Sequence, residues 1–405
     1  MKFFINSYFG DNQSIGLLSH IKKRLPYGMD DQWMVFSHYT ERGWTVDNLW
    51  HIFTDFYGGQ YAPLAFLSYL VLYAGFGYDP FYFHMFSLLL HIGCVCLVWK
   101  LISSLLRVHG GVSEKQILYV NFITTLLFAV HPINVEAVAW ISALKVLLYA
   151  FFYLLGLLCY LRYIRTSKIF YYVLTIGCFL CSFWGKEQAV TFPLALLIVD
   201  WFTNRNMKNL EVWSEKMSFL IMAFFFGIIT VLSQGKGPYE MIFPLYQRLL
   251  FGCFALVEYI TKSLLPVNLN FFYPFPIVLG EEPPLHYYLY PVVLLFLMGW
   301  IIAYRNNRYL VFGVLLFLVN LLFSIHLFNM SRHAIVADRY MYLSYVGIAF
   351  LIANGIWWLR KRLSYFKAAL VFLFFYCFFL SVYTFHYTKK RENTTMVKKY
   401  TKTDE

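Results

Sequence analysis

The sequence predicts an all-α fold, a polytopic bundle of about ten to twelve transmembrane helices. The chain has 405 residues, of which 60% are hydrophobic and only 13% are charged, far from the balance of soluble domains. Apolar stretches long enough to cross a hydrocarbon core of about 30 Å recur from His84 onward. Helices are expected there because every backbone polar group must be hydrogen-bonded within such a segment.

The apolar stretches divide into clear spans and two less simple segments. Spans are predicted at residues 83–106, 117–131, 137–163, 168–184, 188–203, 217–234, 286–304, 308–326, 340–358 and 365–386. Residues 61–77 mix tyrosines with small residues, so we expect a helix lying at the outer interface. Residues 246–266 carry Glu258 and Lys262 at helical i, i+4 spacing. They predict an interfacial or re-entrant element, or a pair of crossings.

The positive charge predicts the orientation of the chain. The net charge is +12, but the basic residues fall in short clusters between apolar stretches, as the positive-inside rule predicts, so no nucleic-acid partner is expected. The clusters that mark cytoplasmic loops are Arg162, Arg165 and Lys168; Arg205, Lys208 and Lys216; Arg305 and Arg308; and Arg360, Lys361, Arg362 and Lys367. The remaining loops then share the opposite, outer face.

This orientation predicts three parts. Residues 1–82 form an outer-face loop with an acidic pair and an interfacial helix, residues 83–386 form the transmembrane module, and residues 387–405 form a polar basic tail. The tail lies outside in this register, against the usual charge bias. The protein is expected to be a multi-pass membrane protein, in the cell inner membrane of a bacterium or the endoplasmic reticulum of a eukaryote.

The first candidate site is the pair Asp30 and Asp31 in the outer N-terminal loop. Solvated acidic pairs are common in loops, so the pair alone is weak support for a site. Burial of such a pair would raise the pKa of one carboxyl and suit it to base chemistry. Both interpretations stay open on these residues alone.

The run HPINVEAVAWISALKV provides further candidates. Pro132 breaks the preceding helix, Asn134 can cap the next, and Glu136 lies in the first turn, where the helix dipole favours a negative charge. Lys145 is predicted about two and a half turns into an apolar helix, roughly 13 Å below Glu136. Either it snorkels or pairs inside the bundle, or it meets a carboxylate or a lipid phosphate.

Other charged residues lie at the outer ends of spans. Lys186 and Glu187 lie at the outer end of one span and Asp200 lies at the inner end of the same span, where interface anchoring explains each. Arg332, His333, Asp338 and Arg339 gather at another outer mouth, where arginines can bind a phosphate bidentately, although Asp338 and Arg339 can also form a surface pair. The aromatic loop 265–276 fits sugar stacking or an interface belt.

Six runs carry a family resemblance: MDDQW, YAPLAFLSYLVLYAGFGYDPFYFHMFSLLLH, HPINVEAVAWIS, GKEQAVTFPLALLIVDW, LLPVNLNFFYPFP and VADRYMYL. Because these six runs occur in this order, the chain resembles the polytopic glycosyltransferases of the GT-C type. Within that type it resembles the transmembrane O-mannosyltransferase-like group, whose members often carry tetratricopeptide repeats. The resemblance implies a GT-C-like module that uses a lipid-phosphate-linked sugar on the outer or lumenal face. It places Asp30 and Asp31 at the catalytic position.

The chain also departs from this family. Residues 1–29 contain no stretch long enough for the transmembrane helix that precedes the acidic loop in the family. This predicts a recorded start that is too late, or a degenerate copy. The segment after HPINVEAVAWIS keeps only Lys145 as a charge. Residues 387–405 are too short for one repeat of about 34 residues.

The resulting hypothesis is transfer of a sugar from a polyprenyl-phosphate donor to a hydroxyl of a protein, glycan or lipid. Asp30 or Asp31 acts as general base with inversion, and Lys145, Lys186, Arg332 and Arg339 stabilise the phosphate. His131 and Glu136 orient the acceptor or, with the aspartates, hold a divalent cation, although no metal motif requires one.

Two alternatives remain. One is a transporter or flippase of a lipid-linked saccharide. It is disfavoured because the cytoplasmic halves of the spans are almost purely apolar. The other is an inactive relic of the glycosyltransferase family.

Overall fold

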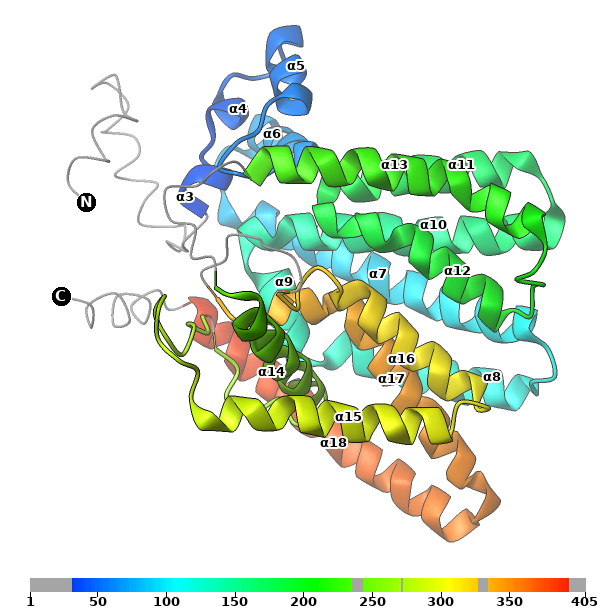
Figure 1. Cartoon of the computed structure of the whole chain (residues 1–405). Coiled ribbons are helices and arrows are strands. Elements are labelled where there is room, and N and C mark those ends of the chain that lie inside the picture. Colours follow the sequence, from blue (N-terminus) through cyan, green and yellow to red (C-terminus); the bar gives the residue numbers. More distant parts are fainter. Residues whose placement is uncertain (1–30, 235–242, 271, 327–333, 393–405) are drawn as a thin grey trace.

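The structure is a computed structural model that describes residues 31–234, 243–270, 272–326 and 334–392. In these ranges the regular secondary structure is helical, apart from one antiparallel bridge between Tyr57 and Gln60. The predicted all-α polytopic bundle is therefore confirmed (Figure 1).

The helices before the first broken span are α3 Asp31–Met34, α4 His38–Glu41, α5 Val46–Thr54, α6 Pro63–Phe76, α7 Pro80–His109 and α8 Glu114–Val130. The middle of the chain contains η1 Pro132–Asn134, α9 Val135–Ala139, η2 Ile141–Ala143, α10 Leu144–Thr166, α11 Ile169–Gly185, η3 Glu187–Thr191, α12 Phe192–Phe202 and α13 Leu210–Gln234. The last part contains α14 Leu245–Leu264, η4 Leu285–Tyr288, α15 Leu289–Ala303, α16 Arg308–Leu321, η5 Asp338–Tyr340, α17 Met341–Trp358, η6 Leu359–Lys361 and α18 Leu363–Glu392.

Each predicted span contains a helix, but fewer helices than expected can cross a membrane by themselves. Within the described ranges, six helical stretches are long and apolar enough: Pro80–His109, Ile141–Thr166, Leu210–Ser233, Leu285–Ala303, Asp338–Lys361 and Leu363–Lys389. A seventh is gained if Glu114–Val130 and Pro132–Ala139, bent by 50°, form one broken span. The count of ten to twelve is higher because α11, α12 and α16 are short; the 14 residues of α16 extend only about 21 Å.

The segment from His131 to Lys145 is more broken than the sequence predicts. As expected, α8 ends before Pro132, where the ring nitrogen Nδ1 of His131 accepts a hydrogen bond from the Ile133 N–H at 3.2 Å. Asn134 occupies the N-cap position of α9 as predicted, but its side chain makes no capping hydrogen bond and instead donates to the Phe128 carbonyl oxygen at 2.7 Å. A second break at Trp140, which is extended, separates α9 from η2. Lys145 is therefore the second residue of α10, and not deep in a continuous helix.

The ends of the long helices separate the two kinds of loop. In Figure 1 the loops that follow α10, α12, α15 and α17 lie at the right-hand ends of the helices, and these are the loops with the basic clusters. The breaks after α8 and α11 and the start of α17 lie toward the opposite ends, which we call the site end. The structure thus keeps the predicted separation.

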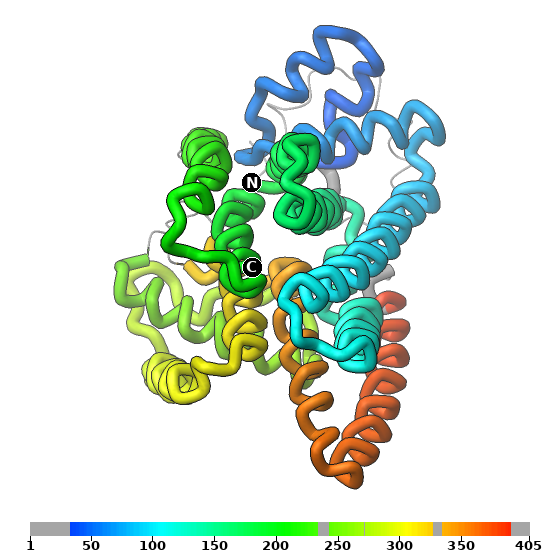
Figure 2. The backbone as a smooth tube through the Cα atoms, turned by 90° about the vertical axis from the view of Figure 1, so that its right-hand side faces the viewer, coloured from blue at the N-terminus to red at the C-terminus, as the bar shows by residue number. Residues whose placement is uncertain are grey.

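The two segments that the sequence did not assign as simple spans, residues 61–77 and 246–266, both form helices. Figures 1 and 2 show α6 lying across the direction of α10 and α13, at the site end, which fits the predicted interfacial helix. A second hydrophobic cluster packs α3 to α6 against Phe83, Ile141, Leu144 and Leu148. The helix α14 is one unbroken helix of 20 residues, which excludes a pair of crossings there.

Candidate functional site

Glu136 and Arg339 form the centre of the candidate site, although 203 residues separate them in the sequence. The Arg339 guanidinium donates to Glu136 Oε1 at 2.7 Å, and the Arg339 backbone N–H donates to Oε2 at 2.8 Å. The guanidinium also lies over the rings of Trp140 at 5.2 Å and Tyr340 at 5.1 Å. The two carboxylate oxygens of Glu136 therefore hold the start of η5 against α9. The break at Trp140 places its ring on one side of the Arg339 guanidinium.

Asp338 points to different partners from its neighbour Arg339. It is 1% exposed. Its carboxylate oxygens Oδ1 and Oδ2 accept a hydrogen bond from the Tyr273 hydroxyl at 3.1 and 3.2 Å. The Lys262 ammonium lies 3.7 Å from the same carboxylate and 3.3 Å from the centre of the Tyr273 ring. The interpretation of Asp338 and Arg339 as a surface pair is wrong, because η5 directs the two side chains toward different elements.

The segment around Asp338 is held by α14 and the aromatic loop. The Ile335 N–H donates to the Tyr273 carbonyl oxygen at 2.9 Å, and the Ala337 N–H donates to the Tyr259 hydroxyl at 3.1 Å. Burial lowers the pKa of Lys262, and the carboxylates of Asp338 and Glu258 oppose this shift. Sequence reasoning noted the Glu258 and Lys262 spacing but did not connect it to the site.

Lys145 connects the site to the N-terminal segment. Its buried ammonium donates to the side-chain oxygen of Gln60 and lies 3.7 Å from the sulfur of Met34. Met34 ends the short helix α3, which begins at Asp31. The backbone of Asp31 is thus within one helical turn of a residue in contact with Lys145.

Several predicted residues cannot be placed at side-chain level. Asp30, Arg332 and His333 lie outside the described residues, and for Asp31 only the backbone is described. Their predicted roles therefore stay predictions.

Lys186 is a buried cation at the break between α11 and η3. It is 3% exposed, and its ammonium lies 4.7 Å from the centre of the Tyr340 ring. Burial lowers its pKa to about 8; the Glu187 carboxylate opposes this shift, and the charges of Lys145 and Arg339 add to it. Among the side chains that the structure describes, which do not include that of Asp31, no carboxylate oxygen lies within 4.0 Å of this ammonium.

His131 and Glu187 have less direct connections to this centre. His131 is buried, and its ring packs against Tyr345 of α17 at 4.2 Å between ring centres, so its described contacts stabilise the break after α8. Glu187 is half-buried at the start of η3, beside Lys186. A role for either in orienting an acceptor stays a prediction.

Three cationic side chains come together in the described part of the site. Lys145, Lys186 and Arg339 come from three separate segments, and the charges of Lys145 and Arg339 act on Lys186. No group of three His, Cys, Asp or Glu side chains that could hold a metal ion occurs in the described ranges. The geometry there suits an anion such as a phosphate.

Sequence reasoning missed five contributors to this arrangement: Gln60, Trp140, Lys262, Tyr273 and Tyr340. The aromatic loop and the Glu258 and Lys262 spacing were visible signals for two of them. The others contribute through contacts across the chain that no local pattern marks.

Comparisons with known proteins identify relatives for part of the chain. The fold defines a multi-pass helical membrane protein, and its site suits an anion. The chain is 32% identical to Protein O-mannosyl-transferase TMTC2 of Mus musculus over 189 residues, 42% of this chain and 21% of that protein. It is 33% identical to the Homo sapiens TMTC2 protein over the same shares, and 28% identical to Protein O-mannosyl-transferase Tmtc3 of Drosophila melanogaster over 38% of this chain and 18% of that protein.

These relatives confirm the predicted resemblance to the transmembrane O-mannosyltransferase-like group. The matched segment spans about a fifth of the length of these curated relatives. No family model matches the chain. No solved structure matches it either, so the GT-C-like architecture stays a prediction.

Proposed function

We propose that the chain is a membrane glycosyltransferase that moves a sugar from a polyprenyl-phosphate carrier to a hydroxyl group of a protein. The names of the relatives suggest mannose as the sugar. The reaction takes place at the site end of the bundle, on the outer face of a bacterial inner membrane or the lumenal face of the endoplasmic reticulum.

Lys186 is the observation that carries this proposal. A buried ammonium is costly unless an anion compensates it. Here the ammonium is 3% exposed and packs on Tyr340; the Glu187 carboxylate attracts it, while Lys145 and Arg339 repel it. A phosphate bound among these residues relieves both the desolvation and the repulsion, so the arrangement favours an anionic ligand over a purely structural role.

The chemistry follows from this placement. The acceptor hydroxyl oxygen attacks the anomeric carbon while the bond from that carbon to the phosphate oxygen breaks. Asp30 or Asp31 takes the hydroxyl proton, and the phosphate leaves with the electron pair, so the anomeric configuration inverts. A phosphate needs no separate general acid, and the added negative charge is stabilised by Lys186, Lys145 and Arg339.

The surroundings support this division of roles. The contact of Met34 with Lys145 brings α3, and with it the backbone of Asp31, toward the cations. Glu136 holds Arg339 through two hydrogen bonds, which fixes the guanidinium relative to Lys186. We assign Glu136 to positioning Arg339 and Asp338 to anchoring the same segment.

The direct test measures sugar transfer in membranes that contain the full chain. Polyprenyl-phosphate mannose is the donor, and a serine- and threonine-rich peptide is the acceptor. We expect the double variant Asp30→Asn, Asp31→Asn to lose at least about 100-fold in rate, since a general base contributes that much. The matched control is Asp47→Asn, which changes an exposed aspartate of α5.

Two outcomes would contradict the proposal. Wild-type rates in the double variant would remove the base assignment. Absence of transfer by the unmodified chain, together with movement of the lipid-linked saccharide between leaflets of liposomes, would favour the transporter alternative.

A further inference from the structure

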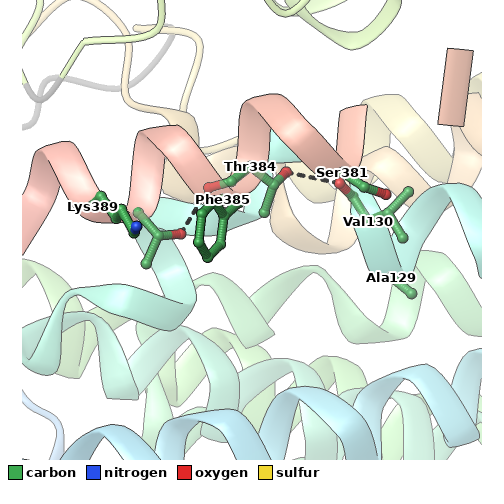
Figure 3. Close-up of a pocket in the computed structure, with 7 residues that line it drawn as sticks. Ala129, Val130, Ser381, Thr384, Phe385 and Lys389 are labelled. Atoms are coloured by element: carbon green, nitrogen blue, oxygen red, sulfur yellow. Dashed lines mark hydrogen bonds between the residues drawn. The ribbon is translucent and has the colours of Figure 1, made fainter. Parts of the chain in front are cut away.

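A shallow crevice lies between the site end of α8 and the last turns of α18, beside the centre described above. It has a volume of about 410 Å³, within the range of small-molecule sites. Figure 3 shows the residues that line it: Ala129, Val130, Ser381, Thr384, Phe385, Thr388 and Lys389. Lys389 is the one charged side chain in this lining.

The hydroxyl groups in the crevice already donate hydrogen bonds to backbone carbonyl oxygens. Thr384 donates to Val130 at 2.8 Å, Thr388 to Thr384 at 2.9 Å, and Ser381 to Cys377 at 2.8 Å. The crevice therefore offers an apolar floor and one cation, and no carboxylate to recognise a sugar. This chemistry fits the chain of a lipid with a phosphate at its head.

Lys389 lies over an aromatic ring of its own helix. Its ammonium lies 4.3 Å from the centre of the Phe385 ring, and no carboxylate oxygen of a side chain that the structure describes lies within 4.0 Å of it; the side chain of Glu392 is outside that set. Lys390 and Arg391 follow it in the sequence. This basic group lies at the site end, where the positive-inside rule predicts few such residues, and the proposed transfer reaction does not use it.

The helix that forms one side of the crevice also carries exposed aromatic side chains suited to acyl chains. Phe372, Phe374, Phe375, Phe378 and Phe385 are exposed on α18, a helix that is long and apolar enough to cross a membrane. A lipid seated at Lys389 can extend its chains along these rings without burying a polar group.

We propose that this crevice binds an anionic phospholipid of the surrounding bilayer, with the phosphate against Lys389 and the chains along the phenylalanines of α18. The occupant would lie next to the Thr384 hydrogen bond to Val130, one residue before the break at His131. The lipid thereby holds α18 against the broken span that carries Glu136. This site is separate from the transfer centre and does not depend on the proposed reaction.

The test uses the full chain in nanodiscs of phosphatidylcholine in which about one lipid in five is the anionic phosphatidylglycerol. Native mass spectrometry then counts the phosphatidylglycerol retained on the released protein. We expect Lys389→Met to reduce retention at least about fivefold and Lys389→Arg to keep it. Lys367→Met, which changes an exposed lysine near the start of the same helix, is the matched control.

A second variant tests the crevice and not only its charge. Ser381→Leu adds bulk at the lining and should reduce retention while leaving Lys389 in place. Equal retention in the wild type, Lys389→Met and Ser381→Leu would overturn the site. Retention of added polyprenyl phosphate but not of phosphatidylglycerol would overturn the assigned occupant. Neither readout involves sugar transfer, so failure here is distinct from failure of the proposed function.

Discussion

At the inner end of the bundle, Asp200 and Glu215 meet Arg205 and Lys216, whereas at the site end no carboxylate of a described side chain lies within 4.0 Å of the Lys186 ammonium. Arg205 holds Glu215 through two hydrogen bonds of 2.6 and 2.9 Å and reaches Asp200 at 3.1 Å. Lys216 lies 2.9 Å from Glu215 and also pairs with Asp200. Two cations thus balance two carboxylates between α12 and α13.

The comparison separates structural charge from charge that suits a ligand. Asp200 and Lys216 have no exposed side-chain surface, yet each has a partner of opposite sign. Lys186 is nearly as buried, but the Glu187 carboxylate attracts it without an ion pair within 4.0 Å, and Lys145 and Arg339 repel it. A balanced cluster stabilises helix packing without a ligand, while a repelled cation is stabilised when an anion binds.

The inner cluster also corrects two expectations. Asp200 is buried in an ion-pair network and is not an interface anchor. The cytoplasmic halves of the spans are therefore not almost purely apolar. The network neutralises itself, however, so it does not resemble a chain of polar groups along a transport path.

The largest expected effect comes from breaking the inner cluster. Lys216→Met leaves Asp200 and Glu215 with one cation, so we expect the free energy of unfolding to fall by about 3–5 kcal/mol. Thermal unfolding of the protein in detergent measures the change. Lys208→Met, in the exposed loop between α12 and α13, is the control and should leave the midpoint unchanged. A Lys216→Met protein as stable as the wild type would mean that the cluster does not stabilise the bundle.

Replacing a buried lysine by methionine at the site end should stabilise the protein, whereas the same replacement at the inner cluster destabilises it. Burial lowers the pKa of Lys186 from 10.5 to about 8, so its charged form costs the folded state up to roughly 3 kcal/mol at neutral pH. Lys186→Met should therefore raise the unfolding midpoint without ligand and yet slow sugar transfer at least about tenfold. Lys186→Arg keeps the charge and is the matched control. Destabilisation by Lys186→Met would show that Lys186 is a structural residue like Lys216.

The sequence predicts the helices and the face on which Lys186 lies, but not the contacts that form the site. Apolar stretches and basic clusters predicted the helices and the face that carries Lys186, because hydrophobicity and loop charge act locally. The use of Glu136 was not predictable, because a helix dipole explains it locally and its partner Arg339 is 203 residues away. The break at Trp140, which brings Lys145 to the start of α10, has no proline or glycine to mark it.

The smallest of these effects is a pH dependence that belongs to the site end alone. A lysine is charged below its pKa, and since burial lowers the pKa of Lys186 to about 8, its charge disappears as pH rises through that value. Transfer at low donor concentration should then decline above about pH 8, approaching tenfold per pH unit. At saturating donor the decline should begin at higher pH, because a bound phosphate raises the lysine pKa. In Lys186→Arg the decline should vanish, since arginine stays charged. An alkaline limb that persists unchanged in Lys186→Arg would assign the titration to another group and remove Lys186 from phosphate binding.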